Sequence, residues 1–600
     1  MNGQGRENAM FRERIYCGEV GAGDVGGRVI LAGWVDKKRD LGGLIFIELR
    51  DVTGIVQIVI NSSKSPEIAA IAESVRSEFC LHVTGTVALR SAETINPNLR
   101  TGTLEVLADK IVILNTSAVP PFPLDSRTPV NEEVRLTYRF LDLRREEMKN
   151  TMIKRHQAMQ AARRYLTDRR FFEIETPMLN KSTPEGARDF LVPSRINRGM
   201  FYALPQSPQL FKQILMVSGF DRYFQIVKCF RDEDLRNDRQ PEFTQIDLEL
   251  SFITREMIME EVEGLVKVMV KEVLGVDVHT PFPCLAYDDV MERYGKDAPD
   301  TRFGLELVTC SEIFAQSEFK VFRAAVEAGG AIKCLPVPDE GKISRKMIDD
   351  YTEYVKIFKA QGLPYFRYRD GAFEGGIAKF LSDAEKSALA AKLGLKGVVL
   401  VFFGSDSLGV VNDTLANLRL QIGRDLGLID ENKFNFLWVL DFPLLEYHEE
   451  DKRYYAKHHP FTSPREEHIP LLESISPANV DSIKAQAYDI VLNGVEIGGG
   501  SIRICTTDVQ RKMFNVLGIT EEEAKIKFSF LLEALKYGAP PHGGIALGLD
   551  RVIMLLLKRA SIRDVIAFPK TQKGQCLMSE APSPVDAVQL RELSIKVVER

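Results

Sequence analysis

Cysteine is scarce in this chain, with eight among 600 residues, and no two are placed as a pair. There is no Cys-x-x-Cys, and no cysteine and histidine spacing of the kind that binds zinc. These absences exclude a disulfide framework and a zinc module. They predict a protein of the reducing cytoplasm.

Long apolar stretches are also lacking. Unbroken apolar runs such as residues 398–403 and 552–557 are too short to cross a bilayer, and the first residues lack the apolar core of a signal peptide. We therefore expect a soluble, cytoplasmic protein with no membrane partner. The net charge of -6 does not by itself indicate nucleic-acid binding, so any polyanionic partner must contact local basic patches.

The usual nucleotide motifs are missing too. No Gly-x-x-x-x-Gly-Lys-[Ser/Thr] occurs, which excludes a P-loop. A Gly-x-Gly-x-x-Gly at residues 21–26 leads into an expected strand instead of opening a helix, so it is not a dinucleotide fingerprint. If arginines bind ATP here, they do so on an antiparallel sheet.

The motif that stands out is a charged hairpin at residues 230–247. Apolar or alternating stretches at 223–230 and 242–252 predict two strands, and the loop between them carries Arg231, Arg236 and Arg239 among acids. An arginine fork at the end of a buried strand suits bidentate contact with phosphate. The alternative is a solvated hairpin held by salt bridges.

The N-terminal part has the strand order of an OB-fold. Strands are expected at residues 29–35, 44–49, 55–60, 81–89 and 104–114, and a helix at 65–77 follows the third. On the nucleic-acid face we place Phe46 as a stacking aromatic, Gln57 as a base reader and Arg39 as a phosphate contact. The alternative for Phe46 is core packing.

The chain is expected to be a multidomain α+β protein. We predict an OB-fold β-barrel for nucleic-acid binding at residues 1–114, a proline-rich hinge at 115–132, a first catalytic part at 133–284, an inserted α+β domain at 285–420, and a second catalytic part with a C-terminal extension at 421–600.

Two helices are expected just after the hinge, at residues 132–145 and 147–170. The second is long and amphipathic and runs into a proline-closed strand. Such a helix forms either a subunit interface or internal packing.

Further polar motifs surround the hairpin in the sequence. A polar loop at 183–189 could be a lid, and Gln209 and Lys212 share one helical face, although Lys212 alone could be a surface lysine. Asp489 and Glu496 flank an Asn-Gly turn, so their carboxylates could converge on Mg²⁺. His458 and His459 could be purely structural.

Taken together, these motifs resemble the bacterial-type aspartyl-tRNA synthetases, which are class II aminoacyl-tRNA synthetases with an antiparallel catalytic sheet. The resemblance covers essentially the whole chain, and it implies that the barrel at 1–114 binds the tRNA anticodon through Arg39, Phe46 and Gln57. It is carried by the strand ending at Pro177, the hairpin at 230–247, Gly548-Leu-Asp-Arg551, and the strings at 183–189, 206–209 and 493–504.

The resemblance implies an activity. The chain would activate L-aspartate with ATP to aspartyl-AMP and pyrophosphate, transfer aspartate to the 3′ end of tRNA(Asp), and act as a homodimer. Arg231, Glu233 and Arg551 would be catalytic, and Asp489 and Glu496 would bind Mg²⁺. The implied aspartate contacts are Glu185, Gln209, Lys212, Arg231, Asp247, His458, His459 and Arg503. The implied ATP contacts are Arg231, Asp232, Glu233, Gln240, Phe243, Glu496, Gly548, Leu549, Asp550 and Arg551.

The resemblance also bears on specificity. Lys212 and Arg503 would hold the side-chain carboxylate of aspartate, and a neutral amide would leave these two buried cations uncompensated. Leu41 stands where enzymes that also charge tRNA(Asn) carry histidine, whereas Glu93 matches neither pattern. We expect a strict enzyme, with one that charges both tRNAs as the alternative. An asparaginyl or lysyl enzyme, an asparagine-forming ligase on this fold, and a non-catalytic RNA-binding protein are the rival readings.

Overall fold

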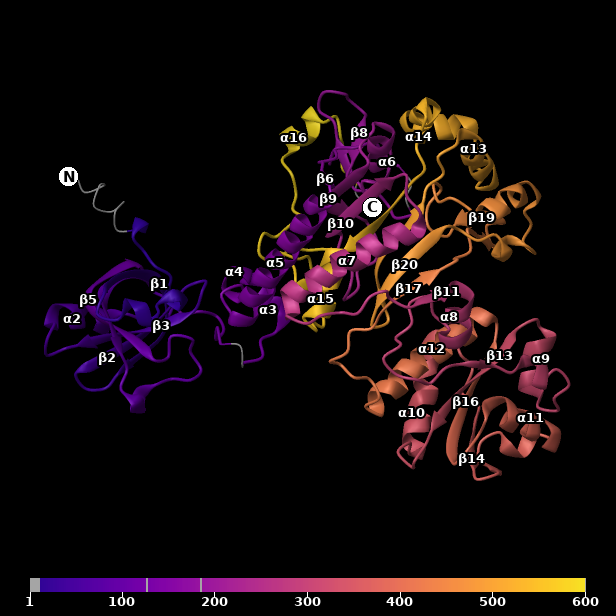
Figure 1. Ribbon diagram of the computed structural model, residues 1–600, viewed down its shortest axis with the longest axis horizontal. Coiled ribbons are helices and arrows are strands. Elements are labelled where there is room, and N and C mark those ends of the chain that lie inside the picture. The colour runs from indigo at the N-terminus through magenta and orange to yellow at the C-terminus, as the bar shows by residue number, and fades with distance from the viewer. Residues whose placement is uncertain (1–10, 126–127, 184–185, 599–600) are drawn as a thin grey trace. The chain divides into compact units, whose positions relative to one another are not determined.

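The computed structural model describes residues 11–125, 128–183 and 186–598 (Figure 1). The chain divides into two compact units, Met1–Asn150 and Thr151–Arg600. Each unit has its own hydrophobic core. The two units are therefore described separately.

The first unit contains a closed five-stranded barrel with strand order β1-β2-β3-β5-β4. Its helix α2 (Pro66–Ser74) follows the third strand and begins with a proline, which fits the first turn of a helix because no amide donor is needed there. The OB-fold prediction is confirmed. The barrel strands are β1 (Arg28–Asp40), β2 (Leu44–Arg50), β3 (Ile55–Asn61), β4 (Cys80–Leu89) and β5 (Leu104–Asn115).

Alternation along β2 separates the inside of the barrel from the outside. Ile45, Ile47 and Leu49 are buried in the barrel core, whereas Phe46 and Glu48 point the other way. The core-packing alternative for Phe46 is therefore excluded.

The helix expected at residues 132–145 is interrupted. The structure has α3 (Glu132–Thr137) and α4 (Arg139–Asp142), and Tyr138 between them has the non-helical angles φ -104° and ψ 44°. The prediction of one continuous helix is wrong. The break could not be predicted, because no glycine or proline marks it in the sequence. The second helix, α5 (Glu146–Asp168), is continuous as predicted.

The second unit is built on an eight-stranded, mainly antiparallel sheet of order β11-β17-β20-β21-β22-β10-β9-β6. The predicted antiparallel catalytic sheet is confirmed. Its strands are β6 (Phe172–Glu173), β9 (Arg222–Phe230), β10 (Glu242–Ser251), β11 (Cys284–Ala286), β17 (Phe436–Leu440), β20 (Ala487–Leu492), β21 (Val495–Ile502) and β22 (His542–Gly548).

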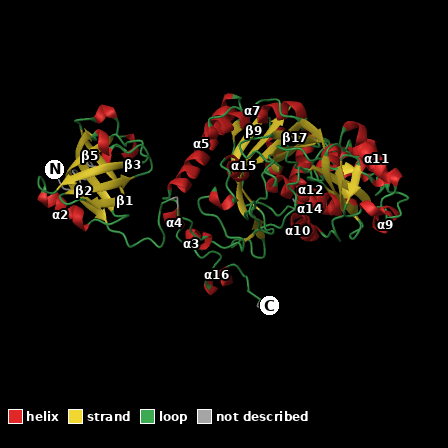
Figure 2. Cartoon of the chain, turned by 90° about the horizontal axis from the view of Figure 1, so that it is seen from below, coloured by secondary structure: helices red, strands yellow, loops and turns green. Residues whose placement is uncertain are grey.

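Three helices share one hydrophobic core with this sheet, and Figure 2 shows them in red beside its yellow strands. They are α5, α7 (Arg255–Leu274) and α15 (Leu549–Leu556), and their apolar side chains form one core with the inward residues of the strands. Ala158, Ala162 and Leu166 of α5 are fully buried in that core, so this helix packs internally. On the opposite face, Leu437, Val439 and Val491 of β17 and β20 pack in a second apolar cluster, whereas polar side chains of β10 and β21 line a cavity.

A separate α+β module interrupts the sheet between α7 and β17. It has a five-stranded sheet of order β12-β13-β16-β14-β15. Its strands are β12 (Val308–Thr309), β13 (Ala331–Pro338), β14 (Tyr365–Arg369), β15 (Ala372–Glu374) and β16 (Val398–Asp406). Its helices are α9 (Lys320–Glu327), α10 (Arg345–Val355), α11 (Asp383–Leu393) and α12 (Leu408–Asp425), and α8 (Tyr287–Tyr294) precedes it.

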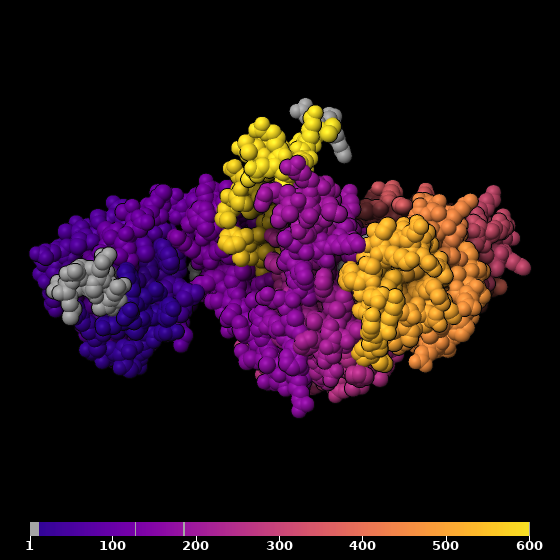
Figure 3. Space-filling view, turned by 90° about the horizontal axis from the view of Figure 1, so that it is seen from above, coloured from indigo at the N-terminus to yellow at the C-terminus, as the bar shows by residue number. Residues whose placement is uncertain are grey.

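Smaller elements complete the second unit. They are the two-stranded pairs β7 (Leu191–Pro193) with β8 (Phe201–Ala203) and β18 (Leu445–His448) with β19 (Arg453–Ala456), and the helices α6 (Gln209–Val217), α13 (Thr507–Val516), α14 (Glu521–Ala534) and α16 (Ala587–Glu592). Figure 3 shows the C-terminal segment, in yellow, extending from the surface of this unit. Among the described residues, no helix has both the length and the apolar character needed to span a bilayer.

Candidate active site

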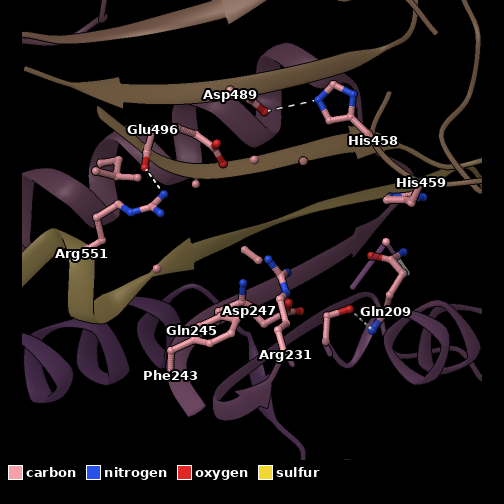
Figure 4. Close-up of a pocket in the computed structure, with 18 of the residues that line it drawn as sticks. Gln209, Arg231, Phe243, Gln245, Asp247, His458, His459, Asp489, Glu496 and Arg551 are labelled. Atoms are coloured by element: carbon pink, nitrogen blue, oxygen red, sulfur yellow. Dashed lines mark hydrogen bonds and ion pairs between the residues drawn. The ribbon is translucent and has the colours of Figure 1, made fainter. Parts of the chain in front are cut away.

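A cavity of about 630 Å³ opens on the free face of the eight-stranded sheet. Figure 4 shows side chains of β10 and the preceding hairpin on one side of it, and those of β20, β21 and α15 on the other. Most of the predicted site residues line it: Gln209, Lys212, Arg231, Glu233, Gln240, Phe243, Asp247, His458, His459, Asp489, Glu496, Arg503, Gly548, Asp550 and Arg551.

Two buried cations meet at the inner end of this cavity. Lys212 of α6 and Arg503, just after β21, are 1% and 3% exposed. Lys212 Nζ lies 2.9 Å from Asp247 Oδ1 and 3.2 Å from Glu249 Oε2. Arg503 donates from Nε to Glu249 Oε1 at 2.9 Å and from Nη2 to Glu249 Oε2 at 3.1 Å. Glu249 therefore joins the two cations directly.

The charge balance around Lys212 and Arg503 differs from the expected one because of Glu249. We expected the two cations to be uncompensated without a substrate carboxylate, but Glu249 and Asp247 already face them. Burial acts to raise the pKa of Glu249, yet Arg503 and Lys212 outweigh it and hold this pKa below its usual value. The formal charges of the four groups cancel, so discrimination against a neutral amide cannot rest on uncompensated cations alone.

The other acid of this cluster, Asp247, is not fully satisfied. Its side chain is fully buried, and its Oδ2 accepts no hydrogen bond from a described residue. Burial raises the pKa of Asp247 to about 6 in spite of Lys212. A cationic donor arriving at Oδ2 would find a free acceptor there.

His459 places a second nitrogen beside Arg503. Its Nδ1 accepts a hydrogen bond from the backbone N–H of Phe461 at 3.1 Å, and its Nε2 lies 2.6 Å from Arg503 Nη1. Burial and the charge of Arg503 lower the pKa of His459 well below its usual value. Two nitrogens 2.6 Å apart leave no room for an atom between them, so His459 contacts the Arg503 guanidinium directly.

Two carboxylates converge at the outer end of the cavity. Asp489 on β20 and Glu496 on β21 lie across the hairpin from each other, and the charge of Asp489 raises the pKa of Glu496 to about 7. Asp489 Oδ1 is buried and accepts no hydrogen bond from a described residue, although His458 Nε2 lies 3.6 Å away.

This pair fits a hard divalent cation such as Mg²⁺. A Cβ on Gly499 would lie 2.6 Å from Asp489 Oδ1 and 3.5 Å from Glu496 Oε1, so the bare glycine leaves room where both oxygens point. Two repelling carboxylates and a buried oxygen without a hydrogen bond are what such an ion stabilises.

Two arginines flank the space between these ends. The Arg231 guanidinium lies 5.1 Å from the centre of the Phe243 ring, and its Nε is buried without a hydrogen-bond partner among the described residues. Arg551 donates from Nη1 to Glu496 O at 2.7 Å and lies 3.3 Å from Asp238 Oδ2. Both cations are placed to meet an elongated polyanion.

Other predicted nucleotide contacts are held by protein groups. The Gln240 side chain is bonded in both directions to the backbone of Lys570. Asp550 accepts from the Thr244 N–H at 2.7 Å and lies 2.5 Å from Arg155. Glu233 pairs with Arg239 at 3.1 Å.

Two predicted ATP contacts, Asp232 and Leu549, do not line the cavity. Asp232 pairs its backbone N–H with Arg188 O, and Leu549 is buried in the core beneath. Glu185 lies outside the described residues.

The predicted anticodon residues occupy one face of the barrel. Arg39 is opposite Phe46 in the β1–β2 register, and Glu48 is opposite Gln57 in the β2–β3 register. Arg39 bonds to Glu48 at 2.8 Å and Gln57 to Glu105 at 3.1 Å. Leu41, at the end of this face, is 70% exposed, and Glu93 is exposed in the loop after β4.

No role was predicted from the sequence for Glu249, which contacts the two buried cations, or for the cavity-lining residues Asp238 and Asp297. Glu249 could have been found, because it lies two residues after Asp247 on β10 and shares its face. Asp238 stood in the hairpin without an assigned role. Asp297 comes from the segment after α8, where no motif pointed to the site.

Comparisons with known proteins agree with this geometry. Residues 131–572 match the family "tRNA synthetases class II (D, K and N)", and residues 29–114 match the "OB-fold nucleic acid binding domain". An aspartate–tRNA ligase of Macrococcus caseolyticus is 54% identical over 98% of this chain and 99% of its own. An aspartate–tRNA(Asp/Asn) ligase of Aquifex aeolicus is 52% identical, again over 98% and 99%.

Solved structures show the same fold. The asparaginyl-tRNA synthetase of Pyrococcus horikoshii, complexed with asparaginyl-adenylate, superimposes with a TM-score of 0.57 at 20% identity, covering 93% of this chain and 98% of that one. With a class II family model over most of the chain and full-length relatives above half identity, the chain belongs to the aspartate–tRNA ligase family of class II aminoacyl-tRNA synthetases.

Proposed function

We propose that the protein activates L-aspartate with ATP and transfers it to tRNA(Asp). The observation that carries this proposal is the single cavity in which Lys212 and Arg503 lie at one end and Asp489, Glu496 and Arg551 at the other. A small dicarboxylic acid and a metal-bound triphosphate fit these two ends.

Aspartate would bind at the inner end. Its side-chain carboxylate would lie against Lys212 and Arg503, whose guanidinium is also in contact with His459. Its ammonium would meet the free Oδ2 of Asp247, with Gln209 nearby. Glu249 would hold Arg503 in this orientation instead of contacting the substrate.

ATP would occupy the outer part. Phe243 and Glu233 would contact adenine, Arg231 the α-phosphate and Arg551 the γ-phosphate. Asp489 and Glu496 would hold Mg²⁺, which when bound neutralises charge on the phosphates. Gln240 and Asp550, whose side chains are held by the protein, would shape this part without contacting the nucleotide.

Chemistry would then depend on position and charge. The aspartate α-carboxylate oxygen attacks the α-phosphorus, the bond to the bridging oxygen breaks, and pyrophosphate leaves. Arg231, placed between the two substrates, stabilises the charge of that transition state. The terminal ribose hydroxyl of tRNA next attacks the aspartyl carbonyl, and AMP leaves.

The test is ATP–pyrophosphate exchange measured with each of the twenty amino acids. We expect exchange with aspartate alone at physiological concentration. Equal exchange with asparagine or lysine would overturn the substrate assignment, and no exchange with any amino acid would favour a non-catalytic RNA-binding protein.

We further propose that the enzyme is strict for tRNA(Asp). Leu41 is exposed beside the face that carries Arg39 and Phe46, and an apolar side chain there offers no hydrogen bond to a base. A relative named aspartate–tRNA ligase and a relative named aspartate–tRNA(Asp/Asn) ligase are equally similar to this chain, at 54% identity. Charging of purified tRNA(Asp) and tRNA(Asn) decides the tRNA range, and equal charging of both would reverse this assignment.

We also propose a cytoplasmic homodimer. The short edge strand β6 exposes Phe172, which is 57% exposed and packs edge-to-face on Phe220. An apolar sheet edge of this kind is suited to covering by a second copy. Light scattering should give twice the chain mass, and a single-chain mass at micromolar concentration would contradict the dimer.

A further inference from the structure

The segment that joins the catalytic sheet to the inserted module packs against the proposed metal site. It runs from Lys296 to Leu305, after α8 and before β12. Asp297 at its start lines the main cavity and also a smaller adjoining cavity of about 220 Å³, together with Asp489, Glu496 and Arg551. This segment therefore reaches the site from the direction of the module.

The same segment contacts the turn of the β20–β21 hairpin. This metal hairpin carries the proposed ligands Asp489 and Glu496. That turn is Asn493-Gly494, and a Cβ on Gly494 would lie 2.8 Å from Asp300 Cβ and 3.2 Å from Asp300 N. Gly494 has φ +84°, which favours glycine for a second reason. Asn435 links this segment to the turn. It donates from Nδ2 to Thr301 O at 3.2 Å and from its backbone N–H to Asn493 Oδ1 at 2.8 Å.

One arginine of the module holds this segment in place. Arg419 of α12 is 2% exposed and donates from Nη2 to the carbonyls of Asp300, Phe303 and Gly304, and from Nε to that of Leu305, at 2.7 to 3.0 Å. Its guanidinium also lies 4.1 Å from the centre of the Phe303 ring. These carbonyls belong to no regular strand, and they accept hydrogen bonds from a residue of the inserted module instead.

We propose that Arg419 is a positioning residue for the metal hairpin. Through the segment 300–305 it fixes the Asn493-Gly494 turn, and the turn sets the approach of Asp489 and Glu496 on either side of it. The inserted module thereby contributes to Mg²⁺–ATP binding without touching substrate. This inference rests on the proposed function, which assigns Asp489 and Glu496 to Mg²⁺.

Two variants disturb the two ends of the relay, by which we mean the contacts that run from Arg419 through residues 300–305 to the Asn493-Gly494 turn. Arg419→Met removes the donors but keeps an apolar side chain of similar length, and Gly494→Ala forces the turn away from Asp300. Arg419→Lys keeps one cationic donor and should restore part of the effect. Arg367→Met is the matched control, because Arg367 of β14 bonds to Ile343 O and Asp339 inside the same module.

The readouts are metal affinity and local protection, not activity alone. Mn²⁺ affinity of the enzyme–ATP complex, measured by electron paramagnetic resonance, should weaken by about 10-fold in Arg419→Met and in Gly494→Ala, the scale seen when groups behind metal ligands are changed. Amide hydrogen exchange at residues 489–496 should speed up in both variants. The KM for aspartate should change little, and Arg367→Met should leave all three quantities as in the parent.

Asp489→Asn separates this inference from the function beneath it. If Asp489→Asn weakens Mn²⁺ binding while Arg419→Met and Gly494→Ala do not, the relay is overturned and the metal assignment stands. If Asp489→Asn leaves Mn²⁺ binding unchanged, the metal assignment itself fails. Equal losses in Arg419→Met and Arg367→Met would also overturn the relay, because general damage to the module would explain both.

Discussion

At the scale of residues, the site is a chain of alternating buried charges. Asp247, Lys212, Glu249 and Arg503 follow one another in contact, so each charge is compensated by its neighbours before substrate arrives. Removing one member leaves its neighbours buried and uncompensated, which is costlier than the loss of the contact itself. Single substitutions here should therefore have large effects.

Lys212→Ala should reduce the kcat/KM for aspartate in ATP–pyrophosphate exchange by about 100-fold or more, which corresponds to about 3 kcal/mol or more for a broken buried pair. The reason is that Asp247 and Glu249 lose their shared cation and the substrate carboxylate loses a partner. Lys228→Ala, at an exposed position of the neighbouring strand, is the control and should behave as the parent. An unchanged kcat/KM in Lys212→Ala would remove this residue from the aspartate site.

Metal binding should depend on pH through Glu496. Its pKa is raised to about 7 by Asp489, so below that pH a proton competes with the cation. Mn²⁺ affinity should increase about fivefold from pH 6 to pH 7 and level off above pH 8. Without metal, the same shift favours the folded state below the usual glutamate pKa, and that stability is lost as pH rises through about 7.

Titration of Mn²⁺ into the enzyme–ATP complex at several pH values checks this dependence. Glu496→Gln should bind the ion more weakly but with no such increase between pH 6 and pH 7. A parent profile that is flat over this range would contradict the proposed competition.

At the scale of elements, hairpins carry the site and glycines give it space. The β20–β21 hairpin contains a register shift between Ile490 and Val491, and Gly498, Gly499 and Gly500 follow on β21. Side chains at these glycines would contact Leu547, Asp489 or Gly544 O. The glycine run is therefore required by close packing and by the room left for a ligand.

Gly499→Ala should weaken Mn²⁺ binding by about 10-fold, the scale of changes just behind a metal ligand. The new Cβ would lie 2.6 Å from Asp489 Oδ1 and displace that carboxylate. Calorimetric titration in the presence of ATP measures the effect. Gly362→Ala, where an added Cβ meets nothing within 4 Å, is the matched control. Identical affinities in the two variants would show that Asp489 does not hold the ion.

Much of the structure at the scale of elements could be predicted from the sequence. The two strands around the charged loop form β9 and β10, because alternation of apolar residues is a local signal. The break at Tyr138 carried no such signal. The role of Glu249 was available from its spacing to Asp247, whereas Asp297 reaches the cavity only through tertiary packing that no local pattern reports.

At the scale of the whole molecule, tRNA recognition and aminoacyl transfer are assigned to different units. The barrel lies within Met1–Asn150 and the catalytic sheet within Thr151–Arg600. The barrel order followed from spacing alone, but the order β12-β13-β16-β14-β15 in the module depends on pairings distant in sequence, which spacing does not report.

Phe46→Ala should weaken charging of tRNA(Asp) while leaving ATP–pyrophosphate exchange unchanged. Loss of a base-stacking ring costs about 1–3 kcal/mol, so kcat/KM for tRNA should drop by about 5-fold to 150-fold. Aminoacylation at limiting tRNA measures this effect. Leu89→Ala, an exposed apolar position elsewhere on the barrel, should charge normally. If Phe46→Ala also charges normally, this face does not bind the anticodon.

The bond between Gln240 and Lys570 has a consequence for synthesis of the enzyme itself. The loop that carries Arg231 and Arg239 is held by backbone groups 330 residues later in the chain. During translation this loop stays unfastened until residue 570 has left the ribosome. Chains that lack the segment around Lys570 should therefore carry the arginines without holding them in a working arrangement, and the cell gains this activity only after that segment has been made.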